Sequence, residues 1–505
     1  MTNARPIRKI LVANRGEIAL RIMRTCREMG IRTVGVYSEA DRAAPHVMSA
    51  DEAYCIGPPP SRESYLAMGT IIDVARRSGA DAVHPGYGFL SENAAFARTV
   101  GDAGLIFIGP RPESIAAMGD KTAARKLVRA AGVPTVPGSD DAVRDLSEVR
   151  SFCSAHGFPL LLKAAAGGGG KGMRIVRAAG EVQGAFAAAQ SEALSAFGDG
   201  RIYMEKYLEG PRHIEIQILA DRHGNTIHLG ERECTIQRRH QKVVEETPSV
   251  IVDDVMRAAM GETAIKAARA CGYENAGTIE FLVDRKRNFY FLEMNTRLQV
   301  EHPVTELRTG LDLVGLQIGI ARGETLPFSQ EGVRLNGHAI ECRICAEDVE
   351  NNFLPSTGRI LHLKTPSGPG IREDRGVELG GEIPVYYDSM IAKLAAWAPT
   401  RAAAIAKMSR ALREYELLGV STNIPLCRFV IEHPRFAAGD FTTDFINEEF
   451  SPARLRTQDD ATESAAAAVS AFLVASHDER ALPLNGTQTN GHTKWRQARS
   501  DFFRD

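Results

Sequence analysis

The sequence lacks any long hydrophobic run. No apolar stretch approaches the roughly 20 residues that a bilayer-spanning helix needs, and the N-terminal segment MTNARPIRKILVANRG has neither a long apolar core nor a cleavage site. The formal net charge is only −2, so composition gives no argument for binding nucleic acid or an anionic membrane. We therefore expect a chain of about three domains, with no nucleic-acid partner and no membrane association.

Cysteine is also scarce. The eight cysteines are scattered without a disulfide framework, which is typical of a protein in a reducing cytoplasm. Cys342 and Cys345 form a C-x-x-C pair, but on the strand expected there the two thiols point to opposite faces, and no second pair completes a zinc site. We predict a cytoplasmic protein in which these thiols form neither a redox nor a metal site.

The glycine signature of dinucleotide-binding folds is absent from the first strand–helix turn. Residues 8–14 read as a strand, Gly16 makes the turn, residues 17–29 form an amphipathic helix, and residues 31–38 return as a strand. This βαβ unit predicts a parallel sheet. Because the turn has no G-x-G-x-x-G, a nicotinamide or flavin dinucleotide is not supported.

A second turn, in HPGYGFLSEN, carries two glycines. Gly86 and Gly88 let the backbone approach a ligand closely, and Tyr87 and Phe89 could wall a pocket. Taken alone, structural glycines explain such a turn better.

A run of glycines from Gly167 to Gly170 joins two predicted strands, the first of which ends in Lys163. Each glycine costs about 1 kcal/mol against alanine in a regular element, and such a run is typical of places where bare N–H groups wrap phosphate oxygens. It is not a Walker A loop, since Lys171 precedes a glycine and no helix follows directly. The pattern predicts a flap over a nucleotide; a plain linker fits poorly between two tight apolar strands.

Basic residues crowd the segment GERECTIQRRHQKVVEETP. We interpret this run as a local positive field that could hold small anions, while neighbouring glutamates keep the wider segment neutral. The basic residues are Arg232, Arg238, Arg239, His240 and Lys242, and the glutamates are Glu231, Glu233, Glu245 and Glu246. A solvated charged face is the ordinary alternative, and His213 and His240, taken singly, read as surface or packing histidines.

Residues 278–301 predict a hairpin that carries two opposed glutamates. A four-residue turn would pair Asp284 with Phe289 and place Glu280 opposite Glu293, on one face with Asn295 and Arg297. Facing carboxylates repel unless a cation lies between them, and this oxygen-only set suits Mg²⁺ on nucleotide phosphates. The alternative is a solvated polar face on an edge hairpin.

Several of these segments occur in one order and at one spacing: HPGYGFLSEN, KAAAGGGGKGM, MEKYLEGPRHIEIQ, ERECTIQRRHQKVVEE, EFLVD…FYFLEMNTRLQVEHPVTE, GHAIECRI, FLPSTGRI and YYDSMIAKL. Together they resemble biotin carboxylase, a member of the ATP-grasp superfamily, between residues 6 and 448. The resemblance implies an α/β chain with an N-terminal Rossmann-like domain (1–118), an ATP-grasp domain (119–335) with a mobile lid (136–206), and a mixed C-terminal domain (336–450). The tail (451–505) contains an Ala-rich helix near 461–476 and is either half-ordered or a docking element for a partner protein.

The resemblance also implies a nucleotide and metal site. The residues expected to contact ATP are Lys121, Lys163, Gly169, Gly170, Glu205, Lys206, Tyr207, Leu208, His213, Gln237, His240, Glu280 and Glu293. Those expected to hold Mg²⁺ or Mn²⁺ are Glu280, Glu293 and Asn295. A metal ion held by these oxygens would neutralise charge that develops between the β- and γ-phosphates.

The implied chemistry is carboxylation of biotin in two stages. Bicarbonate attacks the γ-phosphate of ATP to give carboxyphosphate, and the biotin enolate then captures the CO₂ that carboxyphosphate releases. Lys242, Arg297, Gln299 and the Val300 backbone would hold bicarbonate, and Glu301 would be the general base. Tyr87 and Arg343 would contact biotin, Arg343 stabilising the enolate, so the catalytic set is Lys242, Arg297, Glu301 and Arg343.

No Met-Lys-Met tripeptide marks a biotin attachment site, and no length remains for a carboxyltransferase. We therefore expect biotin in trans on a biotin carboxyl carrier protein, a separate carboxyltransferase subunit, and a homodimer. The parent enzyme is expected to be an acyl-CoA carboxylase acting on acetyl-CoA or a related thioester. The alternatives are a two-subunit pyruvate carboxylase, a non-catalytic nucleotide-binding paralogue, and an ATP-grasp ligase that forms an acyl phosphate for an amine.

Overall fold

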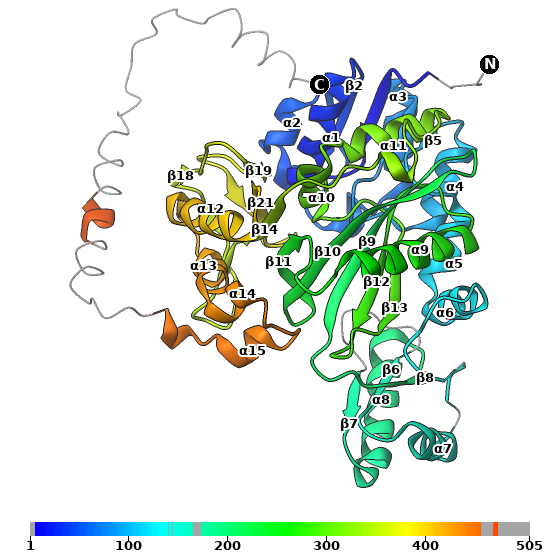
Figure 1. The fold of residues 1–505 in the computed structure, drawn as a ribbon. Helices are drawn as coiled ribbons and strands as arrows, with labels where there is room; N and C mark the ends of the chain where they lie inside the picture. Colours follow the sequence, from blue (N-terminus) through cyan, green and yellow to red (C-terminus); the bar gives the residue numbers. More distant parts are fainter. Residues whose placement is uncertain (1–5, 140, 144, 165–172, 456–467, 473–505) are drawn as a thin grey trace, which may run out of the picture. The chain divides into compact units, whose positions relative to one another are not determined.

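The computed structural model describes residues 6–139, 141–143, 145–164, 173–455 and 468–472 (Figure 1). The chain divides into two compact units, Met1–Pro452 and Ala453–Asp505. In the second unit residues 468–472 are helical, and the rest of the predicted Ala-rich helix lies outside the described residues. No helix in the described ranges is both long and apolar enough to cross a membrane.

The N-terminal part is a parallel five-stranded sheet, which confirms the βαβ prediction. The strand order is β3-β2-β1-β4-β5, and neighbouring strands are parallel throughout. Ile10 and Val12 pack into one hydrophobic cluster while Leu11, between them, packs into another, so both faces of the sheet are buried, as in parallel sheets generally. The strands are β1 Lys9–Val12, β2 Arg32–Tyr37, β3 Glu52–Cys55, β4 Ala82–His84 and β5 Ile106–Phe107; the helices are α1 Gly16–Glu28, α2 Pro45–Ser49, α3 Met68–Ser78, α4 Ala94–Asp102 and α5 Pro112–Gly119.

The segment predicted as a lid has its own small sheet and its own core. Strands β6 (Leu160–Ala164), β7 (Arg174–Val176) and β8 (Ile202–Lys206) are antiparallel in the order β7-β6-β8. Helices α7 (Leu146–His156) and α8 (Val182–Phe197) pack with them around a separate hydrophobic cluster. Residues 165–172, which include Gly169 and Gly170, lie outside the described residues.

An eight-stranded antiparallel sheet forms the centre of the first unit, in the order β13-β12-β9-β10-β11-β14-β21-β19 (Figure 1). Its strands are β9 Arg212–Ala220, β10 Thr226–Arg238, β11 Gln241–Thr247, β12 Asn275–Val283, β13 Phe289–Asn295, β14 His338–Cys345, β19 Ile371–Arg375 and β21 Met390–Ala398. Strand β11 pairs with β14, Glu246 opposite Ile340. Backbone pairing therefore continues across residues 335 and 336, where the sequence predicts a domain boundary.

Helices and short hairpins complete the unit. The remaining helices are α6 Lys121–Ala130, α9 Asp254–Ala270, α10 His302–Thr309, α11 Leu313–Arg322, α12 Arg401–Glu414, α13 Ile424–Glu432, α14 Pro434–Ala438 and α15 Phe445–Glu449. The remaining strands are β15 Glu347–Asp348, β16 Leu354–Pro355, β17 Gly358–Arg359, β18 His362–Lys364, β20 Glu382–Ile383 and β22 Glu416–Leu418. Helix α6 begins at Lys121, where the Asp120 side chain accepts a hydrogen bond from the Ala123 backbone.

The β12–β13 hairpin confirms one predicted pairing and corrects another. Glu280 lies opposite Glu293, as expected, but Phe289 pairs with Val283 rather than Asp284. The Asp284 carboxylate instead accepts from the backbone N–H groups of Lys286 and Asn288, so Asp284 belongs to the turn. A register shift between Glu280 and Phe281 restores the predicted register at the glutamates.

We predict that Gly376→Ala destabilises the protein. Gly376 follows β19, and a Cβ atom there would lie 2.6 Å from the backbone nitrogen of Glu17, at the start of α1. Such overpacking costs about 1–3 kcal/mol, which should lower the thermal unfolding midpoint. The control is Gly184→Ala in α8, where a Cβ meets nothing within 4 Å and alanine should stabilise by about 0.5–1 kcal/mol. Equal midpoints for the two variants would contradict this close approach.

Candidate active site

One lysine ammonium lies among three carboxylates at the centre of the large sheet. Lys242 Nζ is 2.6 Å from Glu215 Oε2, 2.8 Å from Glu280 Oε1 and 2.6 Å from Glu301 Oε1. Strand pairing brings two of these acids together, because Glu215 on β9 lies opposite Glu280 on β12. Glu301 comes from the turn just before α10.

This contact sets the ionisation of the cluster. Burial opposes charge on Lys242, but the three carboxylates hold its pKa well above the usual lysine range. Burial also disfavours ionised Glu301, yet Lys242 and Arg343 hold the pKa of Glu301 well below that of an ordinary glutamate. The pKa of Glu280 is likewise lowered, by Lys242 and His213 against the effect of burial. Glu280 and Glu301 are therefore buried carboxylates in their charged, proton-accepting form at neutral pH.

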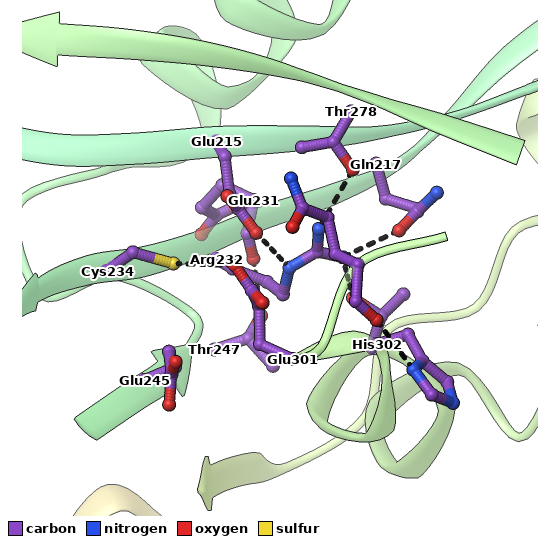
Figure 2. A network of polar contacts seen from close by, with 12 residues as sticks. Glu215, Gln217, Glu231, Arg232, Cys234, Glu245, Thr247, Thr278, Glu301 and His302 are labelled. Atoms are coloured by element: carbon purple, nitrogen blue, oxygen red, sulfur yellow. Dashed lines mark hydrogen bonds and ion pairs between the residues drawn. The ribbon is translucent and has the colours of Figure 1, made fainter. Parts of the chain in front are cut away.

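A fully buried arginine pairs with one of these carboxylates. Arg232 has no exposed surface and pairs with Glu215, which lies opposite it on β9. Its remaining donors reach Gln217 at 2.7 Å, Thr305 at 2.9 Å and Thr278 at 3.0 Å (Figure 2). These partners satisfy the guanidinium, as a buried charge requires.

Arg343 clamps Glu301 from the other side. Its Nε atom donates to Glu245 Oε1 at 2.6 Å and its Nη2 atom to Glu301 Oε2 at 3.0 Å. Burial raises the pKa of Glu245 to about 7. Glu341 lies opposite Glu245 in the β11–β14 pairing, and neither of its buried carboxylate oxygens has a hydrogen-bond partner among the described residues. Burial accordingly raises the pKa of Glu341 well above the ordinary value, which favours the neutral form of this carboxyl group.

The predicted metal ligands lie together. Glu280 and Glu293 face each other across the hairpin, and the Asn295 amide donates to Glu280 at 2.8 Å. Burial and the Glu280 carboxylate raise the pKa of Glu293, which forms an ion pair with Lys121 Nζ at 3.9 Å. Positive charge is therefore short beside these oxygen ligands, and a divalent cation such as Mg²⁺ would supply it. The residues thus fit a Mg²⁺ ion.

His213 and Gln237 adjoin the same carboxylate. His213 Nε2 is 2.8 Å from Glu280 Oε2, and Gln237 Nε2 is 2.7 Å from His213 Nδ1. The Gln237 amide also donates to the Cys234 carbonyl at 2.8 Å. Since this amide nitrogen can only donate, His213 Nδ1 accepts in this geometry, and Nε2 faces Glu280.

Arg297 donates hydrogen bonds to three neighbouring side chains. They reach Glu92 at 2.8 Å, Gln299 at 3.0 Å and Asn295 at 2.9 Å. The predicted bicarbonate residues Arg297, Gln299 and Lys242 thus lie in one network, because the Gln299 amide also donates to Glu280 at 3.3 Å. The Val300 carbonyl accepts from Lys393 Nζ at 2.8 Å, which fixes this turn.

The predicted ATP residues fall into two groups. Lys163 and Arg125 both pair with the Glu205 carboxylate, and the backbone N–H groups of Lys206 and Tyr207 donate to Pro137 and Pro159; partly buried Leu208 follows. Lys121 joins the metal group through Glu293. His240 stands apart, exposed on the β10–β11 turn with a positive φ of 67°.

A cavity of about 470 Å³ lies beside Lys242 and Arg343, the partners of Glu301. The predicted biotin residues Tyr87 and Arg343 line it together with Lys242, Arg297 and Val300. The Tyr87 hydroxyl is buried and has no hydrogen-bond partner among the described residues. An unsatisfied buried hydroxyl is costly and commonly marks a ligand position.

The basic residues of the predicted positive field lie in different places. Arg232 is buried against Glu215, Arg238 is 3.3 Å from Glu347, and Arg239 donates to Asn352 at 3.0 Å. The glutamates predicted to keep the wider segment neutral, Glu231, Glu233, Glu245 and Glu246, are all buried. Arg238 and Lys242 line the same cavity as Arg343, whereas Arg232 and Arg239 do not, so only part of the basic run faces one site.

Sequence reasoning missed the groups that support the predicted site. These are Glu92, Arg125, Glu215, Arg232, Glu245, Glu341 and Lys393. One signal was available, because His213, Glu215 and Gln217 are polar residues alternating with isoleucines along one strand, which predicts a polar face inside a sheet. The other residues come together only through contacts between segments that are distant in sequence.

Family models match almost the whole of the first unit. "Biotin carboxylase, N-terminal domain" matches residues 6–115, "Carbamoyl-phosphate synthase L chain, ATP binding domain" matches 120–329, and "Biotin carboxylase C-terminal domain" matches 341–448. A biotin carboxylase from Halalkalibacterium halodurans is 55% identical over 87% of this chain and 97% of its own length.

Relatives with other names match equally broadly. The propionyl-CoA carboxylase alpha chain of Ruegeria pomeroyi is 52% identical over 88% of this chain and 68% of its own length. A pyruvate carboxylase subunit of Methanothermobacter thermautotrophicus is 52% identical over 87% of this chain and 89% of its own length. In structure, the dimeric biotin carboxylase domain of Hydrogenobacter thermophilus 2-oxoglutarate carboxylase, with MgADP, ADP and bicarbonate, matches with a TM-score of 0.85 and 49% identity, covering 90% of this chain and 99% of its own.

We predict that Arg232→Met strongly destabilises the protein and that Glu215→Gln partly rescues it. Removing the guanidinium leaves the buried Glu215 carboxylate without its arginine partner, and breaking a buried ion pair in this way typically costs about 3–5 kcal/mol. Neutralising Glu215 removes that cost. Thermal unfolding of the two single variants and the double variant measures the coupling. If the double variant loses as much stability as the two single variants lose together, the pair is not coupled.

Proposed function

Because the chain belongs to the biotin carboxylase family, whose members carboxylate biotin with ATP and bicarbonate, we propose that the Lys242 cluster is where bicarbonate is deprotonated and biotin receives CO₂. The observation that supports this most is the Glu301 carboxylate, held between Lys242 at 2.6 Å and Arg343 at 3.0 Å. A general base must be ionised and within reach of its proton donor. Glu301 meets the first condition, and its partners Lys242 and Arg343 line the cavity in which the second would be met.

In this proposal the anion-binding groups orient bicarbonate before it attacks ATP. Lys242, Arg297, Gln299 and the Val300 backbone hold the anion, and Glu301 takes its proton. Lys121 and Lys163 contact the phosphates, and Glu205 to Leu208 contact the adenine along the hinge, with His213, Gln237 and His240 nearby. A Mg²⁺ or Mn²⁺ ion held by Glu280, Glu293 and Asn295 would neutralise the phosphate charge.

Arg343 then acts on biotin. Its guanidinium, always charged, favours the enolate form of the ureido group, and Tyr87 lines the same cavity as a second contact. When the enolate forms, Arg343 can exchange part of its interaction with Glu301 and Glu245 for the new oxyanion. The base and the developing oxyanion therefore share one guanidinium.

We further propose that the chain is the carboxylase subunit of a multi-subunit acyl-CoA carboxylase in the cytoplasm. Biotin would arrive in trans on a carrier protein, with a separate carboxyltransferase. A homodimer is supported by the dimeric relative of known structure, and the eight free cysteines suit a reducing compartment. The carboxylase subunit of pyruvate carboxylase is the second candidate, supported by the pyruvate carboxylase relative.

We predict that purified protein hydrolyses ATP only with bicarbonate, and faster with free biotin. Glu301→Gln should lower this turnover by about 10²–10⁴-fold, as loss of a general base does, and Arg343→Ala should abolish the stimulation by biotin. Glu262→Gln, at an exposed position on α9, is the control and should leave turnover unchanged. ATP binding without bicarbonate-dependent turnover in the folded protein would instead favour a non-catalytic paralogue, and amine-dependent turnover would favour another ATP-grasp ligase.

We predict that Lys242→Met moves the acid limb of the pH–rate profile to higher pH, besides lowering the rate. Lys242 holds the pKa of Glu301 down; without the ammonium, that pKa rises, and ionised Glu301 exists only at higher pH. The measurement is bicarbonate-dependent ATP hydrolysis over a range from acidic to mildly alkaline pH. An unchanged acid limb at a reduced rate would mean that Glu301 is not the titrating base.

A further inference from the structure

Exposed large apolar side chains gather on the short hairpins of the C-terminal part of the first unit. Leu361 is 52% exposed, Leu379 65%, Leu418 46%, Val385 72% and Tyr386 50%. We call these five residues the apolar ridge. Single exposed apolar residues are ordinary, but a contiguous group on a protein surface commonly marks a binding site.

Backbone pairing brings together the segments that carry the ridge. The Leu361 N–H donates to the Leu418 carbonyl at 2.9 Å, and the Gly380 N–H, next to Leu379, donates to the Ile360 carbonyl at 2.9 Å. Strand β17 then pairs with β20, which ends two residues before Val385. The five side chains therefore project from adjoining backbone segments.

The ridge ends at the mouth of the active-site cavity. Tyr386 lines that cavity along with Arg343 and Tyr87. The next residue, Tyr387, fixes the loop: its hydroxyl is 2.5 Å from Ser38 Oγ and donates to the Pro59 carbonyl at 2.7 Å. The Arg15 guanidinium lies 4.1 Å from the centre of its ring. Tyr386 and Val385 are therefore held on a rigid rim rather than on a loose loop.

We propose that the apolar ridge is the docking surface for the protein that carries biotin. This inference rests on the proposed function, in which biotin reaches Arg343 while attached to another protein. That protein must contact the cavity mouth, because its biotin arm enters there, and the ridge is continuous with the mouth through Tyr386. A carboxyltransferase has no such need to reach this cavity. An apolar patch beside the entrance lets a transient partner bind long enough for its arm to enter.

The test separates docking from chemistry. Leu379→Ser/Val385→Ser and, independently, Leu418→Ser remove apolar contacts without touching a residue of the site. Val255→Ser, on a side chain 82% exposed at the start of α9, is the matched control. The substrates are free biotin and the biotinylated carrier protein of the source organism, purified through its biotin on monomeric avidin.

Both ridge variants should carboxylate free biotin at the parent rate, while their KM for the carrier rises about tenfold, equivalent to about 1.4 kcal/mol of lost binding. The control should match the parent with both substrates. An unchanged KM for the carrier overturns the proposal; if the ridge variants then also elute as monomers in size-exclusion chromatography, the ridge is a contact between copies of this chain. Absence of turnover on free biotin in the parent protein is a different failure, that of the proposed function.

Discussion

The site depends on one ammonium group shared by three carboxylates. If Lys242 were absent, three like charges would be packed in a dry interior, those of Glu215, Glu280 and Glu301. Burial would then force protons onto them. With Lys242 present, the carboxylates Glu280 and Glu301 stay ionised, and Arg232 and Arg343 compensate the negative charge that remains. Glu280 can then serve metal binding and Glu301 proton transfer, although both contact the same nitrogen atom.

The geometry of that cluster follows from strand pairing. Arg232, Glu215, Glu280 and Glu293 lie opposite one another on four neighbouring strands, β10, β9, β12 and β13, so they form one row across the sheet. Lys242 reaches this row from β11, and Glu301 from the turn that follows β13. Side chains on a pleated sheet have little freedom to move apart, which pre-organises the site before any substrate binds.

Local sequence predicted what local structure determines. The βαβ unit and the opposed Glu280–Glu293 pair follow from hydrophobic periodicity and strand alternation. The Asp284 pairing was wrong because a side-chain-capped turn and a bulge depend on hydrogen bonds that alternation does not reveal. The burial of Arg232 and Glu245 could not be predicted from local sequence. Arg232 contacts Thr278 and Thr305, and Glu245 contacts Arg343, all from segments distant in sequence. The predicted roles of the site residues stay predictions.

The pairing of β11 with β14 has a consequence for how the chain can be divided. Family models place their division between residues 329 and 341, yet the hydrogen-bonded sheet runs through that division. Two fragments cut there would each expose a long unpaired strand edge, a template for aggregation. The division therefore separates regions of sequence similarity and does not separate folding units. Splitting the chain for fragment complementation is better attempted around the segment predicted as a lid, which has its own core.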